Sequence, residues 1–174
     1  MKHRKNIYVI ALLIVLLPVF LQAGNRIVTN FGDDWKFNKS TLSQSASDVD
    51  DSGWTKVTIP HTWNATDAQD GGGNYTRTVG WYRKKLAWND TFNGKRVYIE
   101  ALAASLKADC YVNGNLVYTH KGGYNAFRFE ITDYLTPGTQ TTIAIKVDNQ
   151  KIDDIAPLSG DFSLLEDYIA RFSW

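Results

Sequence analysis

The feature that most constrains the fold is a series of short segments in which apolar and polar side chains alternate. Residues 95–101 and 141–148 both alternate in this way. A period of two residues is typical of a half-buried β-strand, because successive side chains of a strand point to opposite faces. The sequence predicts further strands within residues 54–59, 81–86 and 127–131.

A tight hairpin is the most specific local prediction. Cys110-Tyr111-Val112 and Leu116-Val117-Tyr118 flank Asn113-Gly114-Asn115, and Asn-Gly readily adopts the positive φ angles of a hairpin turn. Short strands at spacings near ten residues, without a convincing amphipathic helix, predict an all-β fold, a β-sandwich of the jelly-roll kind. Residues 41–52, rich in Ser and Asp, are expected to form a surface loop.

The length and the charge balance exclude several function classes. With 174 residues, the chain is too short for a (β/α)₈ barrel of roughly 250 residues. The chain has 19 Lys and Arg against 18 Asp and Glu, but three of those cations precede residue 24, which leaves 16 against 18 in the remainder. A slightly acidic domain has no basic footprint, so we expect neither a nucleic-acid partner nor an anionic-membrane partner.

The first 23 residues have the pattern of an export signal. Lys2, Arg4 and Lys5 precede an apolar run at residues 7–21, and small residues near Ala23 offer a cleavage site. A permanent membrane anchor is the alternative, but this run falls short of the roughly 20 residues that span a bilayer. We therefore expect residues 1–23 to be a signal peptide, and the mature protein to be periplasmic or extracellular, with no membrane partner after cleavage.

Motifs for metal binding or nucleophilic catalysis are weak. His61 and His120 lack a second His or Cys at ligand spacing, so no zinc site is predicted, although Ca²⁺ bound by loop oxygens stays open. Glycines 71–73 are not followed by the Lys-Ser/Thr of a phosphate-binding loop. Cys110 lies in an apolar strand and is expected to be a small buried hydrophobe. We expect no cofactor and no resident metal.

Carboxylates beside aromatic residues are the remaining candidates. An aromatic ring covers the apolar face of a sugar, and a carboxylate accepts hydrogen bonds from its hydroxyl groups. The same residues also fit ordinary turn positions, so both interpretations stay open. The candidates in turn-like stretches are Asp67, Asp70, Asp153, Asp154 and Asp161.

An ordered series of motifs runs through most of the chain: Ile59-Pro60-His61-Thr62-Trp63-Asn64, Asp70-Gly71-Gly72-Gly73-Asn74-Tyr75, Gly80-Trp81-Tyr82-Arg83, Tyr111-Val112-Asn113-Gly114, His120-Lys121-Gly122-Gly123-Tyr124 and residues 153–162. Together these motifs resemble the N-terminal sugar-binding domain of glycoside hydrolase family 2, most of all its exported β-galactosidase-like members. The resemblance implies a jelly-roll domain, galactose-binding-domain-like, over residues 24–162. It also implies a carbohydrate partner, a β-galactoside or related glycoside.

The resemblance places the catalytic residues elsewhere. Members of this family use one carboxylic acid as acid/base and a second carboxylate as nucleophile, and both belong to a barrel that follows the sandwich and an immunoglobulin-like domain. We therefore expect no catalytic residue here and no activity from this chain alone. The family's sugar-binding Asp matches Asp161, and the loop that also approaches the pocket contributes Asn74 and Asp70 as the other substrate-binding candidates.

The ending departs from the family pattern. After Phe162 the family continues with two apolar residues and Gly-Gly-Ile/Leu-Tyr-Arg-Asp/Glu-Val, which forms a further strand, whereas residues 166–174 read Glu-Asp-Tyr-Ile-Ala-Arg-Phe-Ser-Trp. One codon choice for this stretch, read one base earlier, encodes Gly-Gly-Leu-Tyr-Arg-Glu-Ile-Phe-Leu in register. We expect residues 163–174 to be an aberrant, frameshifted tail that replaces the last strand; divergence before a natural stop is the alternative.

Two functions therefore follow from the sequence. The first is a fragment of an exported family 2 glycosidase that contributes substrate contacts only. The second is a stand-alone carbohydrate-binding module.

Overall fold

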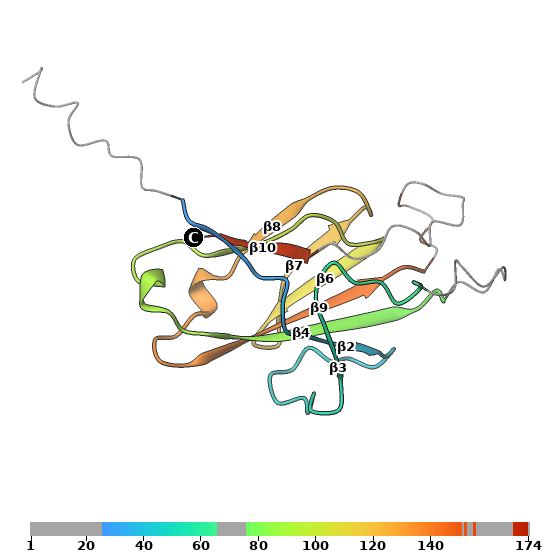
Figure 1. Cartoon of the computed structure of the whole chain (residues 1–174), viewed down its shortest axis with the longest axis horizontal. Coiled ribbons are helices and arrows are strands. Elements are labelled where there is room, and N and C mark those ends of the chain that lie inside the picture. Colours follow the sequence, from blue (N-terminus) through green and yellow to red (C-terminus); the bar gives the residue numbers. More distant parts are fainter. Residues whose placement is uncertain (1–25, 66–75, 151, 153–154, 156–168, 174) are drawn as a thin grey trace, which may run out of the picture.

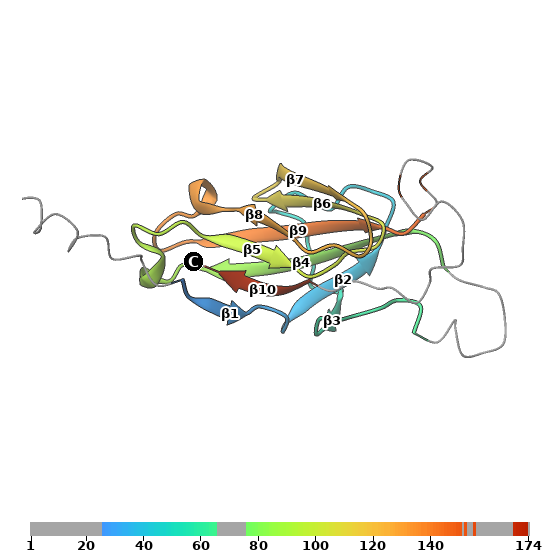
Figure 2. The ribbon, with the colours of Figure 1, turned by 90° about the horizontal axis from the view of Figure 1, so that it is seen from above.

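The computed structural model describes residues 26–65, 76–150, 152, 155 and 169–173. These residues form ten β-strands in two antiparallel sheets (Figures 1 and 2). The predicted all-β class is confirmed. Within the described ranges, no helix has the length and apolar character needed to cross a membrane. The expected signal peptide lies outside them.

The larger sheet has the strand order β3-β2-β4-β9-β6-β7. Its two longest strands pair along their whole lengths, from Val79 opposite Asp148 to Ala87 opposite Gln140. This long central pair fixes one end of the sheet where β4 begins and β9 ends. The strands are β2 (Trp35–Lys39), β3 (Thr55–Val57), β4 (Val79–Ala87), β6 (Lys107–Val112), β7 (Asn115–Lys121) and β9 (Gln140–Asp148).

The smaller sheet has the order β1-β10-β5-β8, with β1 at Val28–Asn30, β5 at Tyr98–Ala101, β8 at Phe127–Glu130 and β10 at Ile169–Ser173. Strand β10 lies between β1 and β5, with Ser173 opposite both Val28 and Tyr98. This strand lies within residues 163–174, the tail that was expected to be frameshifted and to replace the family's last strand. The sequence as it stands therefore supplies a strand here, because Ile and Phe favour extended backbone; the origin of the tail stays a prediction.

The core fills the space between the two sheets, which makes the fold a β-sandwich. Trp35 and Tyr82 of the larger sheet and Ile99 and Phe129 of the smaller one are at most 3% exposed and belong to one apolar cluster. Burying each such side chain contributes roughly 1.5–3 kcal/mol. Cys110 is buried in the same cluster, as predicted, and desolvation raises the pKa of its thiol.

Two local predictions are also confirmed. Strands β6 and β7 form a hairpin, and Asn113 and Gly114 at its turn have φ angles of 48° and 83°. Residues 41–52 contain no strand and form a loop on the outer face of the larger sheet, where the side chain of Arg83 contacts the carbonyls of Gln44 and Ala46. 3₁₀ helices at Asp90–Phe92 and Thr132–Tyr134 complete the connections.

Candidate functional site

The three predicted substrate-binding residues, Asp161, Asn74 and Asp70, lie outside the described residues. The structure does describe the positions from which their segments leave the sandwich. Residues 66–75 precede β4, and residues 153–168 follow β9. Since Val79 of β4 pairs with Asp148 of β9, the two segments start from neighbouring positions at one end of the larger sheet.

Asn149 joins these two starting points directly. Its side-chain Oδ1 accepts a hydrogen bond from the Thr78 backbone N–H at 2.7 Å, and its Nδ2 donates to the Thr76 carbonyl at 3.1 Å. Its backbone N–H donates to the Thr78 carbonyl at 3.3 Å. One residue at the end of β9 therefore holds the strand that leads out of the 66–75 segment.

Asn64 fixes the other end of the 66–75 segment. Its Oδ1 accepts from the Thr76 N–H at 3.0 Å and its Nδ2 donates to the Thr76 carbonyl at 3.3 Å, in a site where Asn64 is only 2% exposed. The indole N–H of Trp63 donates to the same carbonyl at 3.1 Å. We call these residues, Trp63, Asn64, Thr76, Thr78 and Asn149, the loop base.

The sequence motifs at residues 59–64 and 80–83 pack against each other beside the loop base. Trp63 stacks on Phe37 with ring centroids 5.6 Å apart. A Cβ atom added at Gly80 would lie 2.7 Å from the Trp63 ring and 2.8 Å from Phe37. Gly80 is therefore required for the close approach of the Trp63 indole. The two motifs thus support the loop base rather than contacting a ligand themselves.

His61 belongs to the same group of packed side chains beside the loop base. Its Nδ1 lies 2.9 Å from the Tyr82 hydroxyl oxygen, and its ring packs on Phe37. Burial lowers the pKa of His61. Among the described residues, no group of three His, Cys, Asp or Glu side chains could hold a metal ion.

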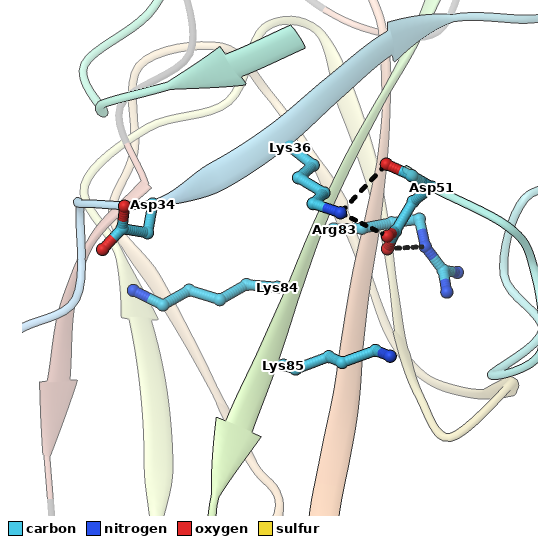
Figure 3. A pocket seen from close by; sticks show the side chains of 6 residues that line it. All are labelled: Asp34, Lys36, Asp51, Arg83, Lys84 and Lys85. Atoms are coloured by element: carbon cyan, nitrogen blue, oxygen red, sulfur yellow. Dashed lines mark hydrogen bonds and ion pairs between the residues drawn. The ribbon is translucent and has the colours of Figure 1, made fainter. Parts of the chain in front are cut away.

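A second feature is a charged cavity on the larger sheet, with a volume of about 320 Å³ (Figure 3). At one side, the Lys36 ammonium lies 2.7 Å from Asp51 Oδ1, and the Arg83 Nε lies 3.2 Å from Asp51 Oδ2. At the other side, Lys84 extends toward Asp34 in Figure 3. The residues that line the cavity are Asp34, Lys36, Asp51, Arg83, Lys84 and Lys85.

Arg83 is the most unusual member of this cavity because it is fully buried. Its Nη1 donates to the carbonyls of Gln44 and Ala46 at 2.7 and 2.8 Å. Desolvation of Asp51 favours its neutral form, but hydrogen bonds from Lys36 and Arg83 outweigh this and lower the pKa of Asp51. The carboxylate is thus ionised and committed to two cations, which makes it an anchor for the 41–52 loop.

Sequence reasoning found neither Asn149 nor the buried state of Arg83. An Asn directly after a strand is an ordinary turn residue by sequence, and its partner Thr76 lies 73 positions away. An Arg in an alternating strand is expected on the solvent face. Its burial depends on the 41–52 loop, whose carbonyls satisfy the guanidinium.

Comparison with known proteins gives the relatives of this chain. The family model described as "Glycosyl hydrolases family 2, sugar binding domain" matches residues 34–166. A beta-glucuronidase of Bacteroides fragilis is 33% identical over 152 residues, which cover 87% of this chain and 21% of that protein. A beta-galactosidase of Thermoanaerobacter pseudethanolicus is 36% identical over 134 residues, 76% of this chain and 18% of that protein.

A solved structure agrees with these sequence relatives. The crystal structure of Bacteroides uniformis beta-glucuronidase is similar with a TM-score of 0.78 and 38% identity, over 86% of this chain and 18% of the other. The chain therefore spans about a fifth of the length of the relatives it matches.

Proposed function

Because the chain belongs to glycosyl hydrolase family 2, whose sugar-binding domain it matches over residues 34–166, we propose that it contributes substrate contacts to an exported glycosidase. Its ligand is a β-galactoside or a related β-glycoside; the relatives carry the names of β-galactosidases and β-glucuronidases. The sandwich is of the jelly-roll, galactose-binding-domain-like type. The sugar-contacting residues are Asp161, supported by Asn74 and Asp70.

The observation that carries this proposal is the loop base. Ligand sites in proteins use a few polar groups that converge from separate segments. Here Thr76, which follows the 66–75 segment, and Asn149, which precedes the 153–168 segment, are hydrogen-bonded to each other. The candidate Asn74 belongs to the first segment and the candidate Asp161 to the second. A rigid base at their start favours a common ligand for both.

The chemistry of bond cleavage belongs outside this chain in our proposal. A retaining glycosidase needs two carboxyl groups about 5 Å apart, one of them able to give up a proton. The carboxylates of the charged cavity do not fit these roles, because Asp51 is bound by Lys36 and Arg83 while Asp34 is paired with Lys56 at 2.8 Å. The catalytic pair would be in a barrel that 174 residues cannot contain.

Sugar binding by the purified 174-residue chain tests this proposal. We expect calorimetry to detect weak binding of a methyl β-galactoside or β-glucuronide, and no hydrolysis of the corresponding aryl glycosides. Asp161→Asn should weaken binding by about tenfold or more, because a hydrogen bond to a charged group contributes about 1.5–3 kcal/mol. The control is Asp48→Asn, an exposed Asp of the 41–52 loop. Equal affinity of both variants would contradict a role for Asp161.

Export is a separate part of the proposal. A signal of the kind seen in residues 1–23 is removed during secretion, so the mature chain should begin at Gly24 and accumulate in the periplasm or outside the cell. Mass spectrometry of the chain from each fraction measures this directly. A full-length chain retained in the cytoplasm would contradict it.

A stand-alone carbohydrate-binding module is the second candidate, and strand β10 favours it. Because β10 pairs with both β1 and β5, the present tail completes the smaller sheet. The DNA that follows the codon for Trp174 distinguishes the two functions. Immunoglobulin-like and barrel domains in a shifted frame would support the frameshifted glycosidase, whereas unrelated sequence in all frames would favour the module.

A further inference from the structure

The charged cavity has more positive than negative charge in its lining. The lining contains four cations, from Lys36, Arg83, Lys84 and Lys85, and two carboxylates, from Asp34 and Asp51. Figure 3 shows Lys84 extending toward Asp34, away from Lys85. Asp34 is also paired with Lys56, which lies outside the lining. The cavity therefore keeps an excess of about two positive charges.

Two of these cations are incompletely compensated. The Nη2 atom of Arg83 is buried and has no hydrogen-bond partner among the described residues. Lys85 is exposed, and within the described part of the chain its ammonium makes no hydrogen bond or ion pair; Figure 3 draws it without a dashed line, on the side of the cavity where Arg83 lies. By contrast, Lys84 donates to the carbonyls of Phe31 and Asp33 at 3.1 and 2.6 Å.

The position of Arg83 strengthens the field in the cavity. A fully buried charge is screened less by water and salt than a charge on a surface side chain. The guanidinium is held in place by Asp51 and by the 41–52 loop, so it acts as a fixed positive charge beside the ammonium groups of Lys36 and Lys85. An anion that enters the cavity would therefore meet a guanidinium that is already held in a fixed position.

We propose that this cavity is a binding site for a small dianion with oxygen atoms on its surface, a phosphate or sulfate group. The ammonium group of Lys85 binds its oxygens together with the third N–H of Lys36, whose other two donate to Asp51, and Arg83 stabilises its charge from beneath. A volume of about 320 Å³ holds such a group with water around it. The site is separate from the loop base, so it would bind an anion independently of the sugar.

The experiment titrates the full chain with sodium phosphate at pH 7 by calorimetry, with sodium chloride keeping the ionic strength constant. We compare the wild type with Lys85→Gln and with the matched control Lys95→Gln, an exposed lysine in the turn before β5. We expect saturable binding that weakens about three- to fivefold in Lys85→Gln, as for loss of one exposed charge contact, and that is unchanged in Lys95→Gln. Both variants remove one exposed charge, so they share any effect of net charge.

Sulfate and acetate distinguish the chemistry of the ligand. Sulfate should bind like phosphate, while the monoanion acetate should bind more weakly. Tighter binding of acetate would overturn the assignment to a dianion. Absence of saturable phosphate binding, or an equal loss in both lysine variants, would overturn the site itself.

Discussion

The loop base and the charged cavity both attach a loop to the larger sheet, but they use different chemistry. At the loop base, neutral amides of Asn64 and Asn149 bind the backbone of residues 76–78. At the charged cavity, Arg83 and Lys36 hold the 41–52 loop through the carboxylate of Asp51. Neutral hydrogen bonds are insensitive to pH and little affected by salt, whereas the ion pairs depend on both. The segments with candidate sugar ligands are thus attached by the contacts that change least with conditions.

Removing the buried cation should have the largest effect. Arg83→Met leaves Asp51 and two loop carbonyls without their buried partner, and we expect a loss of about 3–5 kcal/mol in the free energy of unfolding. The measurement is urea unfolding. Arg96→Met is the control, because Arg96 forms an exposed pair with Glu130 that should contribute no more than about 1 kcal/mol. Similar losses in both would show that burial does not matter for Arg83.

Truncating a neutral contact should cost less. Asn64→Ala removes both side-chain hydrogen bonds to Thr76 in a buried site, and the expected loss is about 1–3 kcal/mol. The exposed Asn93 has no side-chain hydrogen bond within the described residues, so Asn93→Ala should change stability by less than about 0.5 kcal/mol. A loss in Asn64→Ala as large as that in Arg83→Met would abolish the contrast between the two regions.

Filling the space under Trp63 tests the packing of the loop base. Gly80→Ala places a Cβ against two rings, and overpacking of this kind costs about 1–3 kcal/mol; we expect the lower end, because Trp63 is only half-buried. At Gly53 a Cβ meets nothing within 4 Å, so Gly53→Ala should be neutral or slightly stabilising. Thermal unfolding of the two variants measures the difference. Equal midpoints would mean that the indole moves aside freely.

The pH dependence should be the smallest effect and separates the two regions most directly. The pKa of Asp51 is lower in the folded state than its unfolded value near 3.8. The ionised carboxylate therefore stabilises the fold above that unfolded pKa, and this stabilisation is lost as the pH falls through the lower folded pKa. Asp51→Asn should therefore reduce the loss of stability below about pH 4, whereas Asn64→Ala should leave that slope unchanged. Because burial also lowers the pKa of His61 and His120, both variants will lose stability from about pH 6.5 downward.

If the free energy of unfolding fell equally steeply below pH 4 in Asp51→Asn and Asn64→Ala, Asp51 would not be the acid-sensitive group of the charged cavity.

The sequence predicted the parts of this fold that depend on local pattern. Alternation of apolar and polar residues located β5 and β9, and Asn113-Gly114 located the hairpin. Both signals are local, because the two faces of a strand and the φ angles of a tight turn restrict which residues occur at adjacent positions. The loop base was not predictable, since Asn149 meets Thr76 only after β4 and β9 have paired. The resemblance predicted the family, while the roles of Asp161, Asn74 and Asp70 stay predictions.

The smaller sheet joins the two ends of the described chain, and this affects the timing of folding. Val28 pairs with Ser173, so synthesis must reach residue 173 before β1 gains its neighbour in the sheet. Contacts between distant positions are slow to form, because a long loop must close first. The position of β10 therefore delays closure of the smaller sheet until residues 169–173 have been synthesised and can pair with both β1 and β5.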